Sequence, residues 1–287
     1  MPSIVSHVAT SDGTDLLVRH WPSDGVEAGG AWAGPPWASI LLVHGLGEHS
    51  GRYEVVGNQL AAAGLEVFAY DQRGMGGSGG RRGDVERWSQ FLDDLGERLA
   101  VVQAGAGDRL VALYGHSLGG LDVAGYLLSD RPKPHVAVLA SPALDSAIPV
   151  WKKRLAMVLA RVTPTVAIPN GIKPETLSRD PSVAAKTADD PFCMKASTAR
   201  FGAAAIAEQA RVRRECSGGF GVPTLVIHGE DDGLVPVSAS AVLEGAPGVE
   251  RRTFPGLRHE LHNEPEGPAI VDGIIVWLRE RATLAGN

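Results

Sequence analysis

The chain has 287 residues, of which 44% are hydrophobic, and a formal net charge of −6 at pH 7. This length and apolar content suffice for one large α/β domain with an insertion, without a second independent domain. A weakly acidic chain offers no basic field for a phosphate backbone, so we expect no nucleic-acid partner.

Compartment signals are few. Residues 1–10 carry neither the basic segment nor the apolar run of a signal peptide, and no stretch of about 18 apolar residues follows. Two cysteines, Cys193 and Cys216, are too few for a disulfide framework, and we interpret them as reduced structural thiols. We therefore expect a cytoplasmic protein, or one peripheral to a membrane.

Predicted strands and helices alternate through the first half of the chain. The turn residues 11–14 join two strands, which predicts an antiparallel hairpin at the edge of a sheet. Residues 22–37 are rich in Gly, Ala and Pro and predict an exposed connection. The later strands are apolar without alternation, typical of a parallel sheet covered by helices on both faces. The expected strands are 4–9, 16–21, 39–43, 65–70, 110–114 and 136–139, and the expected helices are 53–63, 85–103 and 118–128.

This alternation stops after Pro142 and resumes with an apolar strand at 224–228. A structureless loop of that length is implausible in a compact domain, so we predict an inserted helical cap. The predicted organisation is a core of residues 1–144 and 219–287 with a cap of residues 145–218. A helix at 236–243, a strand at 250–254 and a helix at 267–281 complete the core.

Residues 148–162, in the predicted cap, mix apolar side chains with four lysines and arginines in a basic amphipathic pattern. One interpretation is a lid that makes transient contact with a membrane or lipid surface. The other is a helix packed on its neighbours with a solvated basic face. The sequence leaves both open.

A nucleophile elbow is indicated by residues 109–126, RLVALYGHSLGGLDVAGY. An apolar strand pattern runs into Gly-His-Ser-Leu-Gly and directly into a helix of small residues, so a serine is delivered at a tight turn. We predict Ser117 as the nucleophile, because free N–H groups at the helix start favour the charge that develops on an attacked carbonyl. Ser78 also lies in a Gly-x-Ser-x-Gly sequence, but no helix follows it, and we interpret it as part of a loop.

A serine nucleophile needs a base to take its proton and an acid to hold that base. In sheets of this kind the acid and then the histidine follow the serine, each just past a strand end. The loop after strand 224–228 contains Asp231 and Asp232, and the loop after strand 250–254 contains His259. This placement favours His259 over His262, whereas composition alone leaves both aspartates open.

An oxyanion hole needs one N–H group from the residue after the nucleophile and one from the loop after an earlier strand. Leu118 supplies the first and Leu46, in the sequence HGLG, supplies the second. His44 and His116 flank the site, and we interpret them as a loop-shaping histidine and an elbow side chain.

Two further motifs are rejected on spacing and context. His259 and His262 are three residues apart, whereas the two histidines of a zinc-protease helix are four apart, so we expect no metal. Gly74, Gly76 and Gly79 match a dinucleotide-binding pattern, but no helix follows to hold a pyrophosphate. We interpret these glycines as a turn and expect no cofactor.

Taken together, several segments resemble the monoglyceride lipases of the α/β-hydrolase fold. They are residues 44–53 (HGLGEHSGRY), 71–74 (DQRG), 115–120 (GHSLGG), 178–181 (SRDP), 228–232 (HGEDD) and 255–259 (PGLRH). A set that spans nearly the whole chain is far more specific than any one motif. The resemblance implies an α/β-hydrolase fold with a lid, a triad of Ser117, Asp232 and His259, and oxyanion donors at Leu46 and Leu118.

The resemblance also implies a glycerol pocket. In the family, a glutamate and an arginine of the HG-x-GEHSGR segment and a histidine three residues after the catalytic one face the glycerol hydroxyls. The matching residues are Glu48, Arg52 and His262. A structural ion pair between Glu48 and Arg52 is the alternative. Met75 and Gly77 depart from the family's usual His and Arg after DQRG.

We therefore expect a serine hydrolase that cleaves monoacylglycerols to fatty acid and glycerol through an acyl-enzyme, with the cap enclosing the acyl chain. A lysophospholipase, a general carboxylesterase or an aminopeptidase would use the same fold and triad. A non-catalytic binding protein of this fold is the alternative from a different class. Three triad candidates in the right order argue against it.

Overall fold

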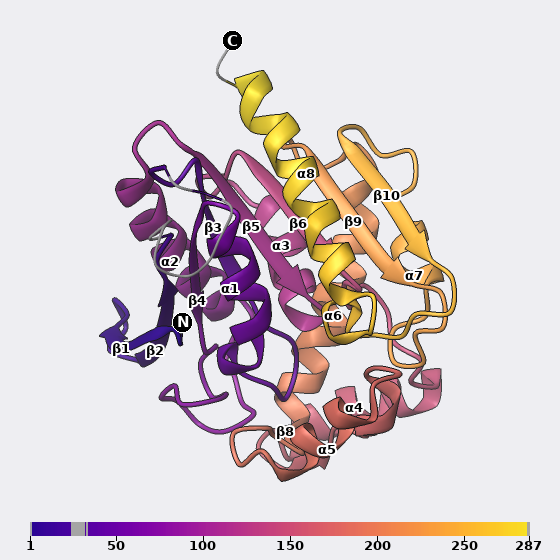
Figure 1. Cartoon of the computed structure of the whole chain (residues 1–287). Helices are drawn as coiled ribbons and strands as arrows, with labels where there is room; N and C mark the ends of the chain where they lie inside the picture. The colour runs from indigo at the N-terminus through magenta and orange to yellow at the C-terminus, as the bar shows by residue number, and fades with distance from the viewer. Residues whose placement is uncertain (1, 24–31, 33, 286–287) are drawn as a thin grey trace.

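A computed structural model describes residues 2–23, 32 and 34–285 (Figure 1). Its main sheet has eight strands in the order β1-β2-β4-β3-β5-β6-β9-β10. β1 and β2 form an antiparallel hairpin at one edge, β2 pairs antiparallel with β4, and the other neighbours are parallel. The strands are β1 (Ile4–Ala9), β2 (Asp15–Trp21), β3 (Ala38–Val43), β4 (Leu65–Tyr70), β5 (Leu110–His116), β6 (Val136–Ala140), β9 (Thr224–Gly229) and β10 (Val249–Phe254). The predicted edge hairpin and mostly parallel sheet are confirmed.

Helices cover both faces of this sheet, with α1 and α8 on one side and α2, α3 and α6 on the other (Figure 1). Successive strand residues point to opposite faces. Leu41 and Val43 of β3 therefore join the hydrophobic cluster of α2 and α3, whereas Ile40 and Leu42 join that of α1 and α8. The two buried layers explain why the strands are apolar without alternation. The core helices are α1 (Glu54–Ala62), α2 (Ser89–Ala106), α3 (Leu118–Leu127), α7 (Ser238–Ala241) and α8 (Gly267–Ala285), with short 3-10 turns η1 (Ser50–Tyr53) and η4 (Leu261–Asn263), while the turn η3 (Cys216–Gly218) directly follows α6.

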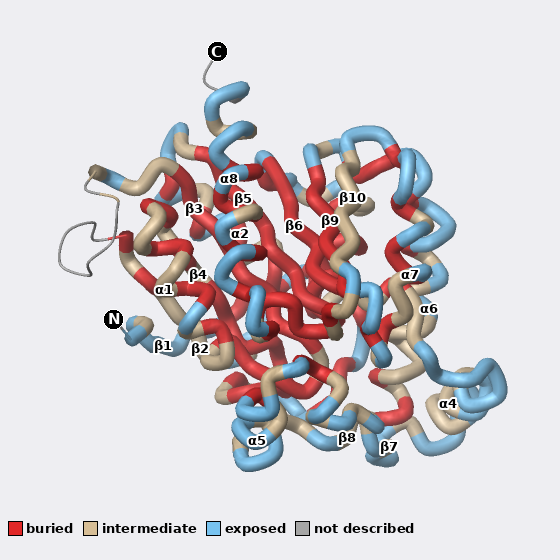
Figure 2. Tube along the Cα trace, turned by 45° about the vertical axis from the view of Figure 1, so that its right-hand side comes forward, coloured by how far each residue is buried: buried red, intermediate tan, exposed pale blue. Residues whose placement is uncertain are grey.

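Between β6 and β9 the chain forms additional helices and a small two-stranded sheet. Figures 1 and 2 place α4, α5 and β8 together at one end of the molecule. α6 packs Phe201 and Val212 into the hydrophobic cluster of α2 and α3, whereas α4 has no buried residue. Among the described residues, no helix is long and apolar enough to cross a bilayer. The elements are α4 (Val150–Val162), β7 (Ala167–Pro169), η2 (Pro174–Thr176), α5 (Pro181–Asp189), β8 (Ala196–Thr198) and α6 (Ala199–Glu215).

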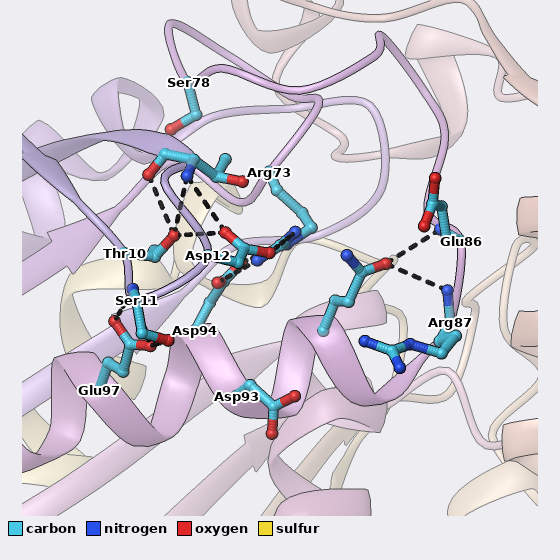
Figure 3. Close-up of polar contacts among 12 residues, drawn as sticks. Thr10, Ser11, Asp12, Arg73, Ser78, Glu86, Arg87, Asp93, Asp94 and Glu97 are labelled. Atoms are coloured by element: carbon cyan, nitrogen blue, oxygen red, sulfur yellow. Dashed lines mark hydrogen bonds and ion pairs between the residues drawn. The ribbon is translucent and has the colours of Figure 1, made fainter.

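Two helix predictions differ from the structure in their bounds, those of α2 and α7. α2 begins at Ser89 rather than at residue 85, because the Gln90 side chain accepts the N–H groups of Glu86 and Arg87 at 3.1 Å each (Figure 3). These bonds satisfy the two backbone donors outside the helix. The predicted helix 236–243 is limited to α7, and the predicted connection 22–37 lies largely outside the described residues.

Candidate active site

The elbow is built by β5, Ser117 and α3. Ser117 has φ 53° and ψ −114°, a strained conformation for a residue with a Cβ, and its N–H donates to the Ala140 carbonyl at 2.9 Å. A Cβ on Gly115 would lie 2.3 Å from the Gly119 carbonyl oxygen, and one on Gly119 would lie 2.2 Å from that of Val43. The backbone packing therefore requires both glycines of the motif.

Ser78, the other serine in a matching motif, has a different environment. Its hydroxyl donates to the Asp71 carbonyl at 2.5 Å and accepts an N–H of β2 at 2.9 Å. In the same loop, Arg73 forms a bidentate ion pair with Asp94 and bonds Asp12 at 2.9 Å (Figure 3). These contacts agree with the interpretation of Ser78 as a loop residue.

The two departures from the family pattern lie in this loop as well. Met75 is completely buried in the hydrophobic cluster of α2 and α3. The Gly77 N–H donates to Asp71 Oδ2 at 2.7 Å, and a Cβ on Gly77 would lie 2.6 Å from a Leu17 methyl group. The same carboxylate accepts the Ser50 N–H at 2.7 Å, so Asp71 fixes the loop to the start of η1.

Asp232 and His259 meet at the edge of the sheet where β9 and β10 end. His259 Nδ1 lies 2.7 Å from Asp232 Oδ2. The other oxygen, Oδ1, accepts the N–H groups of Leu234 and Val235 at 2.9 Å each. Asp231 is exposed, so the geometry separates the two aspartates that composition left open.

Each member of this pair controls the protonation of the other. Burial alone would raise the pKa of Asp232, but the charge and hydrogen bonds of His259 and His228 hold it well below its ordinary range. Burial alone would lower the pKa of His259, but the Asp232 carboxylate raises it above its ordinary value. Nδ1 therefore carries a hydrogen toward Asp232, and Nε2 is available as a base. The His259 ring lies 4.8 Å from that of His116, the residue before Ser117.

The loop after β3 carries Leu46, and Leu118 is the first residue of α3. The first N–H groups of a helix have no partner within it. His44 fixes the other loop, because its Nε2 accepts the Gln72 N–H at 2.9 Å while Nδ1 lies 2.8 Å from the Gly45 carbonyl. Burial lowers the pKa of His44, and the ring is neutral with its hydrogen on Nδ1. These contacts agree with a loop-shaping role.

Glu48 and Arg52 are paired with each other and with a residue that the sequence did not indicate. Arg52 bonds Glu48 Oε2 at 3.0 Å and holds Glu260 in a bidentate pair at 2.7 and 2.8 Å. Glu48 Oε1 accepts the Gly45 N–H at 2.6 Å and the Tyr53 hydroxyl at 2.9 Å. These contacts of Glu48 and Arg52 match the alternative interpretation from the sequence, a structural ion pair. The only sequence signal for Glu260 was its position between His259 and His262.

His262 differs from these charged residues in its hydrogen bonding. His262 is 6% exposed, and its ring stacks on Tyr53 at 4.9 Å and meets His116 edge-on at 5.1 Å. Within the described part of the chain, neither of its ring nitrogens has a hydrogen-bond partner. Burial lowers the pKa of His262, and a neutral ring offers one donor and one acceptor to a ligand.

One group of described side chains, His49, Asp190 and Cys193, brings three candidate metal ligands within 4.8 Å of one another. His49 Nδ1 accepts the Gly51 N–H at 3.2 Å, so Nε2 carries the hydrogen and donates to Asp190 at 2.8 Å. Burial raises the pKa of the Cys193 thiol to about 12, which disfavours the thiolate that a metal requires. The group fits a hydrogen-bonded link better than a metal site. Cys193 and Cys216 are both free thiols.

Comparison with known proteins identifies the family. The family model described as serine aminopeptidase, S33, matches residues 34–266. The monoacylglycerol lipase of Mycolicibacterium smegmatis is 32% identical, over 85% of this chain and 88% of that protein. The human monoglyceride lipase is 31% identical, over 98% of this chain and 92% of its own length.

Solved structures agree in fold. The monoacylglycerol lipase of Paleococcus ferrophilus, 28% identical, superposes with a TM-score of 0.78 over 98% of this chain and all of that one. A soluble variant of the Saccharomyces cerevisiae monoglyceride lipase, 21% identical, gives 0.86 over 98% and 96%. The chain therefore belongs to the monoglyceride lipase family of α/β-hydrolases.

Proposed function

We propose that this enzyme hydrolyses monoacylglycerols, with Ser117 as nucleophile, His259 as base and Asp232 as the acid that orients it. The observation that carries the proposal is the 2.7 Å contact between His259 Nδ1 and Asp232 Oδ2, and the strained elbow conformation of Ser117 supports it. The names of the similar lipases from M. smegmatis and human support the substrate class.

In the first half of the proposed reaction, His259 Nε2 takes the Ser117 hydroxyl proton while Oγ bonds to the ester carbonyl carbon. The N–H groups of Leu46 and Leu118 stabilise the resulting oxyanion. When this intermediate collapses, the ester C–O bond breaks and the departing glycerol oxygen takes the proton from His259. Water then repeats the sequence on the acyl-enzyme, releasing the fatty acid and restoring Ser117.

We infer that the glycerol moiety lies against His262, whose unpaired nitrogens can bond hydroxyls. Glu48, Arg52 and Glu260 form the charged wall behind it, and Arg52 outweighs burial to keep the pKa of Glu260 below its ordinary value. Two carboxylates against one guanidinium leave this wall negative. A neutral diol is therefore preferred over the phosphate of a lysophospholipid.

The proposed cap, residues 145–218, covers the oxyanion loop. The Met194 N–H donates to the Gly47 carbonyl at 2.8 Å, and the Asn170 side-chain amide donates to the Met194 carbonyl at 3.1 Å. Ser117 retains only 9% exposure. We infer that an acyl chain enters when these covering segments move, and that the cap then encloses it.

We also propose that α4 contacts the lipid surface from which the substrate comes. Trp151 is 63% exposed, Val158 54% and Val162 74%, on a helix that also carries Lys152 and Arg161. Exposed apolar side chains with flanking cations suit the interface of a membrane with anionic lipids.

The test compares 1-monoacylglycerol with diacylglycerol, triacylglycerol, lysophosphatidylcholine and short p-nitrophenyl esters as substrates of the wild type, Ser117→Ala and His262→Ala. Ser117→Ala should lose nearly all activity on every ester while it stays folded. His262→Ala should lower kcat/KM about 10-fold for monoacylglycerol, because a substrate hydroxyl loses its partner, and leave the p-nitrophenyl esters unchanged. Substantial activity of Ser117→Ala would refute the mechanism, and a preference for simple esters would refute the glycerol pocket.

A further inference from the structure

Asp232 is held by a second histidine, which lies on the strand that precedes it. His228, at the end of β9, places Nε2 3.2 Å from Asp232 Oδ2 and 3.0 Å from the Val235 carbonyl oxygen. A carboxylate and a carbonyl can only accept, so Nε2 carries a hydrogen shared between them. Asp232 Oδ2 therefore accepts from two histidine rings, His228 and His259.

The other nitrogen of His228 continues this chain of contacts toward β10. Nδ1 lies 2.9 Å from Ser240 Oγ in α7, and Ser240 Oγ accepts from Arg251 Nε at 3.0 Å. The Ser240 hydroxyl itself donates to the Val237 carbonyl at 3.1 Å. His228 and Ser240 are completely buried, so water does not compete for these bonds.

We propose that His228 is a positioning residue of the triad, which fixes the Asp232 carboxylate in the plane that aligns His259 with Ser117. The inference rests on the proposed function. Two backbone N–H groups hold Oδ1, so Oδ2 is the oxygen whose direction depends on side chains. His228 does not reach the substrate and acts only through Asp232. A carboxylate held on both oxygens keeps the His259 ring in one orientation before the substrate arrives.

Several charged groups surround the His228 and His259 rings and contribute to the pH dependence of the activity. His228 contacts Asp232, which lies in the loop after β9. Through Ser240 it is also linked to Arg251 of β10, and Arg251 lies 3.6 Å from Glu244. His259 is influenced by Asp232 and also by Glu260, Glu48 and the neighbouring His116 and His262. A substitution at His228 leaves these groups in place, so a change in the profile reports the loss of its N–H.

The experiment measures kcat, KM and the pH profile of kcat/KM for His228→Ala, His228→Gln and Ser240→Ala, with a short p-nitrophenyl ester and with 1-monoacylglycerol. His228→Ala should lower kcat about 10- to 100-fold on both esters with KM unchanged. Its acid limb should move to higher pH, because a carboxylate with one donor fewer stabilises the His259 imidazolium more. His228→Gln retains an N–H at this position and should recover most of kcat. Ser240→Ala should change kcat and the pH of the acid limb by less than His228→Ala does.

Thr224→Val, on the same buried strand, is the matched control. It removes a hydroxyl that donates to the Val222 carbonyl at 3.0 Å, and should lower Tm without changing kcat or the acid limb. A folded His228→Ala with wild-type kcat, or with reduced kcat and an unmoved acid limb, overturns the proposal. If His228→Ala does not fold, unchanged kcat and acid limb in Ser240→Ala overturn it. Activity in Ser117→Ala would instead refute the proposed function, which keeps the two failures distinct.

Discussion

His259 determines how the activity should depend on pH. Its pKa is raised by Asp232, so the ring takes up a proton above the ordinary histidine value as the pH falls and can no longer act as a base. We expect the acid limb of kcat/KM to lie above about pH 6.5. Asp232→Asn should move this limb to lower pH and reduce kcat by about 10⁴-fold. Asp231→Asn removes the exposed neighbouring carboxylate and should change neither, and equal effects of the two substitutions would contradict the assignment of the acid.

At the residue scale, the sequence predicted those side chains that a strand end or a turn places directly. Ser117, Asp232 and His259 each follow a strand of the parallel sheet, and the contact of Asp232 with His259 follows from that topology. Glu260 could not be predicted in its role, because its partner Arg52 lies 208 residues away. The contact of His228 with Asp232 was missed as well, since a buried histidine at a strand end has no distinctive pattern.

At the element scale, the exposed face of α4 can be tested against vesicles that contain anionic lipid. Trp151→Ser combined with Val158→Ser should weaken co-sedimentation about 10-fold or more, because two apolar side chains no longer enter the lipid interface. Val101 is 58% exposed, close to the 54% of Val158, but it belongs to α2 and therefore lies outside the proposed cap. Val101→Ser should therefore bind like the wild type, and equal binding by all variants would exclude α4 as the contact.

The elements themselves were predicted unevenly. The apolar strands and the long α8 follow from hydrophobic periodicity, and the structure contains them near the expected bounds. β7 and β8 have three residues each, too few for a periodic pattern. The start of α2 depends on the Gln90 side chain, which periodicity does not register. The cap boundaries remain a prediction, and α6 shows why they are hard to place, since it packs Phe201 against the core.

At the scale of the whole molecule, a buried acid on α3 should make stability depend on pH. Asp122 is completely buried, and within the described residues neither carboxylate oxygen has a hydrogen-bond partner. Burial raises its pKa well above the ordinary value, and the nearby acids Glu208 and Asp94 add to the shift. In the unfolded chain this group ionises near pH 4, whereas the folded state keeps its proton, so stability decreases as the pH rises above about 4.

Asp122→Asn, which keeps the shape of the protonated acid, should remove this dependence. We expect a gain in Tm of about 2–4 °C or more at pH 8 and a smaller gain at pH 5, measured by thermal unfolding. Asp130→Asn, at an exposed position just after α3, should leave Tm nearly unchanged at both values. A gain for Asp122→Asn that does not vary with pH would show that the carboxyl ionises alike in both states.

The burial of Ser117 affects how the enzyme treats esters other than its substrate. An activated serine open to solvent would cleave any ester that diffused past it, whereas Ser117 is 9% exposed and the loop that carries Gly47 is bonded to Met194, which in turn is bonded to Asn170. We propose that the resting enzyme is latent. We expect selection among esters to begin before any headgroup is recognised, with the ability of a molecule to displace these contacts and stay long enough to react.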